Sequence, residues 1–216
     1  NDTIMPVVSW VKTTQPGTPP EGITPGALAF AVHPGGAWSS VAVAWHLDDA
    51  EPDLARAAWK LDGLDEATPP RAGFKLIHHQ EGNARMAGTL WKLWKLTRLP
   101  IVYDSGNPQD KAIVGDLLRM ARPRPEVRAL TYGEKAVAAT NLLNVIKTGD
   151  AEHWEQEPLD RAAARAVPRI SGKSTLFGIP DSDPTADITG LEAVSYALFA
   201  LPAPAVEDSF APIIVS

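Results

Sequence analysis

Two apolar runs in the first quarter of the chain predict a β-hairpin. The first is "ALAFAVH" at residues 27–33 and the second lies at 38–47, with a Pro-Gly-Gly turn between them. Short apolar runs joined by turn residues are typical of two antiparallel strands. The run "GFKLIHH" at 73–79 predicts a third strand.

After residue 80 the apolar pattern changes to that of a helix. A helix capped by Asn83 is predicted at about 83–98, because apolar residues recur there at helical spacing. Its core face consists of Met86, Leu90, Leu93 and Trp94. Asn107 and Pro108 begin a second helix, as cap and first-turn residue. The other predicted elements are strands at 99–104 and 127–132 and helices at 134–147, from 157 to Pro168 and at 187–200.

This order of elements predicts an α/β fold. Three consecutive strands would pair antiparallel and the later strands would join as parallel βα units, giving a mixed sheet flanked by helices. Residues 1–26 carry five prolines and little periodicity, so they are predicted as a linker or extended arm, with residues 27–216 as the domain. The acidic stretch 48–70 is predicted as an excursion with a short helix near Leu54 to Trp59.

Composition limits the classes of function. The 216 residues, 44% of them hydrophobic, suffice for one domain with a full core. No run of about 18 apolar residues occurs, so no membrane span is predicted, and the first residues do not read as a signal peptide. Because the chain has no cysteine, any metal must be held by Asp, Glu or His side chains.

The distribution of charge is more informative than the net charge of −6. An acidic chain has little overall affinity for nucleic acid, since such binding depends on Lys and Arg meeting phosphates. Two basic clusters nevertheless stand out, and they are predicted to hold a DNA backbone: Arg119, Arg122, Arg124 and Arg128, then Arg165, Arg169 and Lys173. The alternative is that these basic residues only form part of a solvent-exposed surface of mixed charge.

Three polar positions at the ends of predicted elements are candidates for chemistry. His33 ends the first strand, Asp104 ends the fourth, and Asp187 opens the last helix. Carboxylates gathered at a sheet edge suit Mg²⁺ or Mn²⁺, and two such ions about 4 Å apart can activate water and stabilise a leaving oxygen. The alternative is that each Asp only forms a turn or caps a helix.

Other motifs carry less weight. "SGKST" at 171–175 lacks the first glycine of a phosphate-binding loop, where Val167 stands, and is predicted as a mobile loop. His78 and His79 alternate across a strand and cannot face one metal together. His46 and His153 have no partner at ligand spacing.

Four stretches together resemble the C-terminal nuclease domain of the large terminase subunit of tailed bacteriophages. They are "LAFAVHPGGAWSSVAVAW", "IVYDSGNP", "TYGEKAVAATNLLNVI" and "ADITGLEAVSYALFAL". The resemblance implies a ribonuclease H-like fold and an endonuclease that cuts concatemeric phage DNA with divalent metal. It also implies an N-terminal ATPase domain in the same subunit, and residues 1–26 would be the linker from that domain. The implied partners are double-stranded DNA, the small terminase subunit and the portal, in the host cytoplasm.

Carried onto this sequence, the resemblance makes Asp104 and Asp187 two metal ligands. Asp183 is close enough in sequence to Asp187 to be a supplementary ligand, and Glu81, just after the third strand, is another acid that could approach the sheet edge. Position 33 matches the first ligand, which is normally Asp, and here it is His33. A neutral imidazole removes one negative charge and is a poor match for Mg²⁺. Two alternatives therefore stay open: a catalytically impaired module that binds DNA or docks onto the packaging motor, and another ribonuclease H-like enzyme such as a Holliday-junction resolvase or transposase.

Overall fold

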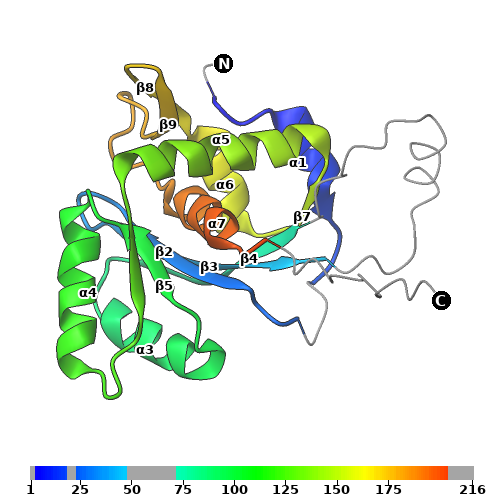
Figure 1. The fold of residues 1–216 in the computed structure, drawn as a ribbon. Coiled ribbons are helices and arrows are strands. Elements are labelled where there is room, and N and C mark those ends of the chain that lie inside the picture. The colour runs from blue at the N-terminus through cyan, green and yellow to red at the C-terminus, as the bar shows by residue number, and fades with distance from the viewer. Residues whose placement is uncertain (1–2, 19–22, 48–71, 204–216) are drawn as a thin grey trace, which may run out of the picture.

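A seven-stranded mixed sheet forms the centre of the molecule (Figure 1). The computed structural model describes residues 3–18, 23–47 and 72–203. The strands follow one another across the sheet in the order β1-β7-β4-β3-β2-β5-β6. Their bounds are β1 Thr14–Gln15, β2 Ala27–Val32, β3 Trp38–His46, β4 Ala72–Glu81, β5 Ile101–Asp104, β6 Val127–Leu130 and β7 Ala151–Trp154. The predicted excursion at 48–70 lies outside the described residues.

The strand directions confirm the predicted sheet. β2, β3 and β4 pair antiparallel, while β5 pairs parallel with β2 and β6 pairs parallel with β5. β7, which the sequence pattern did not predict, adds to β4 in parallel. Gly73 of β4 faces Trp45 of β3, and a Cβ atom there would lie 2.4 Å from the indole ring, so only glycine fits.

Helices cover both faces of the sheet (Figure 1). The helices α3 Met86–Thr97 and α4 Pro108–Met120 lie on one face, and α5 Tyr132–Thr148, α6 Glu157–Arg165 and α7 Thr189–Ala200 lie on the other. β2 is buried along its whole length because both of its faces are covered, which explains its continuous apolar sequence. None of the helices in the described part of the chain is long and apolar enough to cross a membrane.

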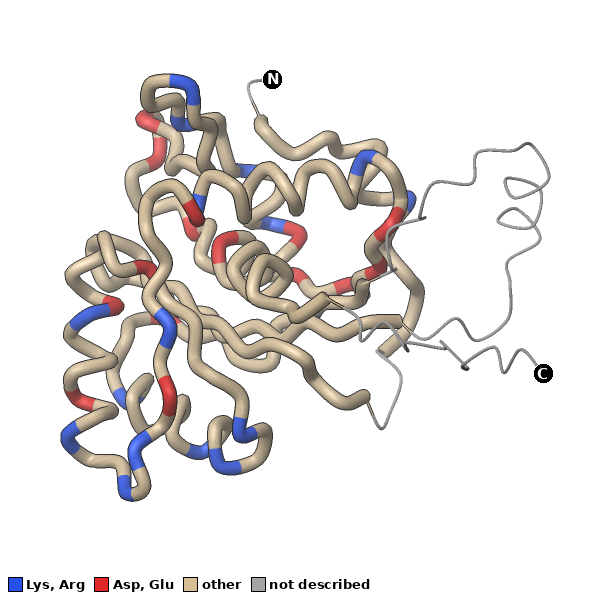
Figure 2. Tube along the Cα trace, viewed as in Figure 1, with Lys and Arg blue, Asp and Glu red and all other residues tan. Residues whose placement is uncertain are grey.

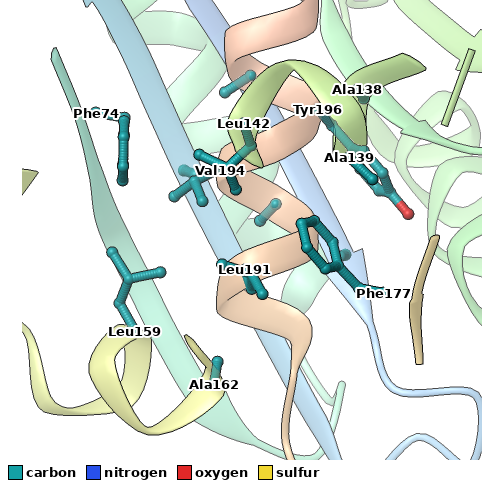
Figure 3. Packing of buried hydrophobic residues seen from close by; sticks show 14 of the residues in the cluster. Phe74, Ala138, Ala139, Leu142, Leu159, Ala162, Phe177, Leu191, Val194 and Tyr196 are labelled. Carbon is teal, nitrogen blue, oxygen red and sulfur yellow. The ribbon is translucent and has the colours of Figure 1, made fainter. Parts of the chain in front are cut away.

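α7 is the central helix of the larger core. It packs directly on β2 and β3, and its Ala193 and Ala197 are fully buried, so the helix approaches the sheet closely. Figure 3 shows Leu191 and Val194 of α7 among side chains of β4, α5 and α6. α7 is thereby fixed over the sheet, and its first turn is held at one edge of it.

Residues 3–18 differ from the prediction of a linker or extended arm. They form α1 Val7–Thr13 and β1, which pairs parallel with β7. Trp10 is buried, and its Nε1 donates to Oδ1 of Asp160 at 2.9 Å. The helix has only seven residues, and Val7, Val8 and Val11 are exposed, so no amphipathic pattern marks it in the sequence.

The structure also corrects three local predictions. Asn107 caps α4 as expected, accepting from the Gln109 N–H at 3.0 Å. Asn83 caps nothing, because α3 begins at Met86 and the Asn83 side chain donates to Gln109 instead. α6 ends at Arg165 rather than at Pro168, and the predicted loop at 171–175 is the turn of a β-hairpin, β8 Val167–Ser171 and β9 Ser174–Gly178.

Candidate functional site

The three predicted site positions lie at one edge of the sheet. β2 and β5 run parallel and pair at Ala29 and Val102, so His33 and Asp104 follow at the same edge. Alternation along each strand turns both side chains to the face that carries α5 and α7. Asp187 stands two residues before α7, which begins above this edge.

Asp104 is buried and its carboxylate already has a counter-ion. Nζ of Lys135, in the first turn of α5, lies 2.5 Å from Oδ2 of Asp104, and the Lys135 side chain is only 10% exposed. The other oxygen, Oδ1, accepts from the Gly106 N–H at 2.6 Å. Lys135 is held in place because Thr131 and Glu134 form a capping box at the start of α5.

Asp187 is buried and takes part in a hydrogen-bond network with β3 and β4. Its Oδ1 accepts from the N–H and the hydroxyl of Thr189, at 3.0 and 2.7 Å. Its Oδ2 lies 3.5 Å from Nε2 of His79. Ser40 bridges Thr189 and His79 at 2.7 and 3.0 Å. Asp187 therefore holds Thr189, the first residue of α7, although the N-cap residue of that helix is Ile188.

His79 belongs to the site although it was not among the candidates predicted from the sequence. Burial lowers the pKa of its imidazole, while the Asp187 carboxylate acts in the opposite direction. The ring also stacks on Trp38 with centroids 5.4 Å apart. Regular alternation from Phe74 and Leu76 would bring His78 to the α7 face, but a β-bulge between Val41 and Ala42 shifts the register and brings His79 there instead. The alternation of the sequence therefore gave no signal for His79.

His33 uses both of its ring nitrogens within the chain. Nδ1 accepts from the Gly35 N–H at 3.0 Å, so the proton of the neutral ring is on Nε2. Nε2 lies 3.2 Å from the carbonyl oxygen of Pro184 and donates to it. The imidazole therefore joins the end of β2 to the segment before α7, and neither nitrogen presents a lone pair to a metal.

Two polar residues at the start of α4 fix the ends of β2 and β5. Asn107 is the N-cap of α4, and Asp110 lies in its first turn. The Asp110 carboxylate is fully buried and accepts from the N–H groups of Val32 and Asp104, at 3.1 Å each. Asn107 donates to the carbonyl of Val32 at 2.6 Å. Burial raises the pKa of Asp110 well above its usual value, and the two N–H bonds oppose that shift. These roles were not predicted from the sequence.

A cavity of about 260 Å³ opens beside Asp104. Lys135, Arg169 of β8, and Glu192 and Tyr196 of α7 line it. Burial raises the pKa of Glu192 to about 7, and the Asp104 carboxylate adds to the effect, whereas Lys135 and Arg169 oppose it. Glu192 was missed because it is one polar residue in a strongly apolar helix.

The supplementary acids lie apart from this arrangement. Asp183 has a 42% exposed side chain that lies 3.5 Å from Nη1 of Arg165 and accepts from Thr185. Glu81 is exposed at the end of β4, opposite Trp38. Among the described residues, no three His, Asp or Glu side chains are grouped so that they could hold a metal ion.

The two basic clusters lie at different ends of the molecule (Figure 2). Arg165, Arg169 and Lys173 belong to α6 and the β8–β9 hairpin, and Arg169 lines the cavity beside Asp104. Arg119, Arg122 and Arg124 stand at the far end of α4, about 20 Å from its first turn for a helix of 13 residues. Arg128 of β6 lies 3.5 Å from Glu134.

Comparisons with solved structures place this fold among phage large terminases. The HK97 bacteriophage large terminase matches 91% of this chain, with a TM-score of 0.60 and 14% identity. The match covers 43% of that chain, so this sequence corresponds to less than half of it. The large terminase nuclease from thermophilic phage G20c with bound cobalt matches 89% of this chain and 97% of its own, with a TM-score of 0.48 and 12% identity.

The HK97 match confirms the predicted ribonuclease H-like fold. The same G20c nuclease with bound magnesium matches with a TM-score of 0.44 and 12% identity, over 89% of this chain and 97% of its own. No protein-family model and no curated protein sequence matches the chain.

Proposed function

We propose that this chain is the nuclease domain of a phage large terminase, cutting concatemeric double-stranded DNA during genome packaging. One observation supports the proposal: position 33 and Asp104 follow neighbouring parallel strands at the same edge of the sheet, Asp187 precedes the helix packed on that sheet, and the fold is like that of the HK97 large terminase. The proposed partners are DNA, an ATPase domain of the same subunit, the small terminase subunit and the portal, in the cytoplasm of the infected host.

The β8–β9 hairpin is the proposed binding surface for the DNA backbone. Arg169 and Lys173 are exposed on it, and Arg169 also lines the cavity at Asp104. Cations beside the candidate site would hold a phosphate backbone without reading its sequence. Arg119, Arg122 and Arg124 are separated from this edge by the length of α4, so their binding to the same stretch of DNA has less support.

A nuclease of this kind is expected to depend on Mg²⁺ or Mn²⁺. In the arrangement seen here, however, the candidate ligands His33, Asp104 and Asp187 do not fit a centre of two metal ions. Hard cations take oxygen ligands, and carboxylates are the strongest of these. Asp104 is bonded to Lys135, Asp187 is bonded to Thr189, and His33 contributes no free nitrogen. We therefore assign no chemical step to a metal ion in this site.

A second candidate function is binding without cleavage, as a clamp on DNA or a docking module of the packaging motor. The engaged ring of His33 favours it, because position 33 then has a structural role, joining β2 to the segment before α7. Such a domain would bind duplex DNA in a salt-dependent way and cut none.

Plasmid cleavage tests the proposal and separates it from the second candidate. Supercoiled plasmid is incubated with the chain in Mg²⁺, Mn²⁺ or chelator, alongside Asp104→Asn and Asp187→Asn. Chelator-sensitive nicking that both substitutions abolish supports the nuclease, with exposed Asp116→Asn as the control that keeps activity. Duplex binding with no cutting in any metal overturns the nuclease in favour of the binding module.

A further inference from the structure

Lys135 is a buried cation bonded directly to a candidate ligand. Its ammonium donates to Asp104 at 2.5 Å, and both side chains are nearly buried, at 10% and 13% exposure. A close pair removed from water interacts far more strongly than a surface ion pair. The interaction is therefore a fixed part of the site, unlike the exposed pair of Arg165 and Asp183.

Two cations, Lys135 and Arg169, line the cavity together with the carboxyl groups of Asp104, Asp110 and Glu192. The Asp110 carboxylate is already bonded to the N–H groups of Val32 and Asp104. His33 is neutral in this arrangement, where an aspartate would add a further negative charge. A divalent ion at Asp104 would therefore meet a positive neighbour on that carboxylate, Lys135.

We propose that Lys135 is the resident cation of this site, occupying on Asp104 the position that a divalent ion would take. The inference deepens the proposed function, on which it rests, and it predicts that this chain binds divalent ions weakly. Binding of a metal at Asp104 requires the ammonium to leave the carboxylate. Removing the Lys135 charge should therefore create a measurable metal site at Asp104.

Direct metal titration tests this without relying on cleavage. Mn²⁺ is added to the wild type, Lys135→Met and Lys135→Gln, and bound ion is followed by electron paramagnetic resonance and calorimetry. Exposed Lys111→Met is the control for loss of a lysine. Removal of one positive charge next to the ion should tighten Mn²⁺ binding about tenfold or more. Adding Asp104→Asn to either Lys135 variant should abolish the gain.

Equal Mn²⁺ affinity in the wild type and in folded Lys135→Gln overturns the inference. A thermal melt of each variant identifies loss of folding, and Lys135→Gln retains a hydrogen-bond donor for Asp104 if Lys135→Met unfolds. The two proposals fail separately. A gain in Mn²⁺ binding by a chain that never cuts DNA rejects the nuclease alone, whereas metal-dependent cutting with no gain rejects the role of Lys135 alone.

Discussion

The backbone N–H of Asp104 donates to Oδ2 of Asp110 at 3.1 Å, so a buried carboxylate on α4 holds the end of β5. The other oxygen of the Asp110 carboxylate, Oδ1, accepts from the backbone N–H of Val32 at the end of β2. The last residues paired between β2 and β5 are Ala29 and Val102. Beyond them the pairing of the two strands ends, and the Asp110 carboxylate joins the strands at Val32 and Asp104 instead. The edge that carries His33 and Asp104 is thus fixed from the opposite face of the sheet.

Replacing Asp110 should destabilise the fold. Asp110→Ala leaves two buried N–H groups without acceptors, which costs about 2–4 kcal/mol of the free energy of unfolding. Asp116→Ala, an exposed position on the same helix that pairs with Arg119, should change it by less than about 0.5 kcal/mol. Urea denaturation of both variants measures this, and equal effects would show that Asp110 does not fix the strand ends.

The N-terminal segment should contribute to stability as part of the domain. The rings of Trp10 and His153 are tilted against each other with centroids 4.0 Å apart, and Trp10 is 5% exposed, so Trp10→Ala should cost about 3–5 kcal/mol. Val8 on the same helix is 70% exposed, and Val8→Ala should be nearly neutral. Thermal unfolding distinguishes the two. A Trp10→Ala variant as stable as the wild type would return residues 3–18 to the role of a linker.

DNA affinity should depend on the hairpin more than on the end of α4. Arg169→Gln with Lys173→Gln should weaken duplex binding and lower the salt slope by about 1 for each phosphate that the variant no longer neutralises. Arg122→Gln with Arg124→Gln removes the same charge at the distant end and should have a smaller effect. Fluorescence anisotropy across a salt series measures both. A larger effect of the α4 pair would place the DNA on the other end of the molecule.

Glu192 should make stability depend on pH. Its pKa is about 7 in the folded chain against a usual 4.5, so the folded state binds the proton more tightly than the unfolded state. Stability should therefore be greatest below about pH 4.5 and fall as the pH rises to about 7. Glu192→Gln, which cannot ionise, should be more stable than the wild type by about 3 kcal/mol at pH 8 and similar at pH 4.5.

Denaturant melts at the two pH values measure this difference. Exposed Glu126→Gln serves as the matched control and should follow the wild type at both. Parallel behaviour of Glu192→Gln and the wild type from pH 4.5 to 8 would contradict the role of burial at Glu192.

Local signals made much of the fold predictable. The β2–β3 hairpin follows from its Pro-Gly-Gly turn, and α4 follows from Asn107 and Pro108, because in each case neighbouring residues determine the conformation. β7 and α1 were not predicted, since both are short and depend on distant partners. β1 is two residues long and exists only beside β7.

The site was predictable only as a set of positions. Strand ends indicated His33 and Asp104, because neighbouring parallel strands end at one edge of a sheet, and the start of the last helix indicated Asp187. Their partners were not predictable: Lys135 lies 31 residues from Asp104, and Pro184 lies 151 residues from His33. Those interactions decide whether a carboxylate or a ring nitrogen is free, and only the packing of α5 and α7 creates them.

Substitution of His33 is the most direct test of whether the sheet edge that carries Asp104 is a terminase-type cleavage site. His33→Asp keeps an acceptor for the Gly35 N–H, loses the bond to Pro184, and adds a carboxylate between two strand ends. Plasmid cleavage by this variant and by the wild type, with Mg²⁺, Mn²⁺ and chelator, should show chelator-sensitive cutting raised about tenfold or more by the added ligand. Unchanged or reduced cutting by a folded His33→Asp variant would contradict the account.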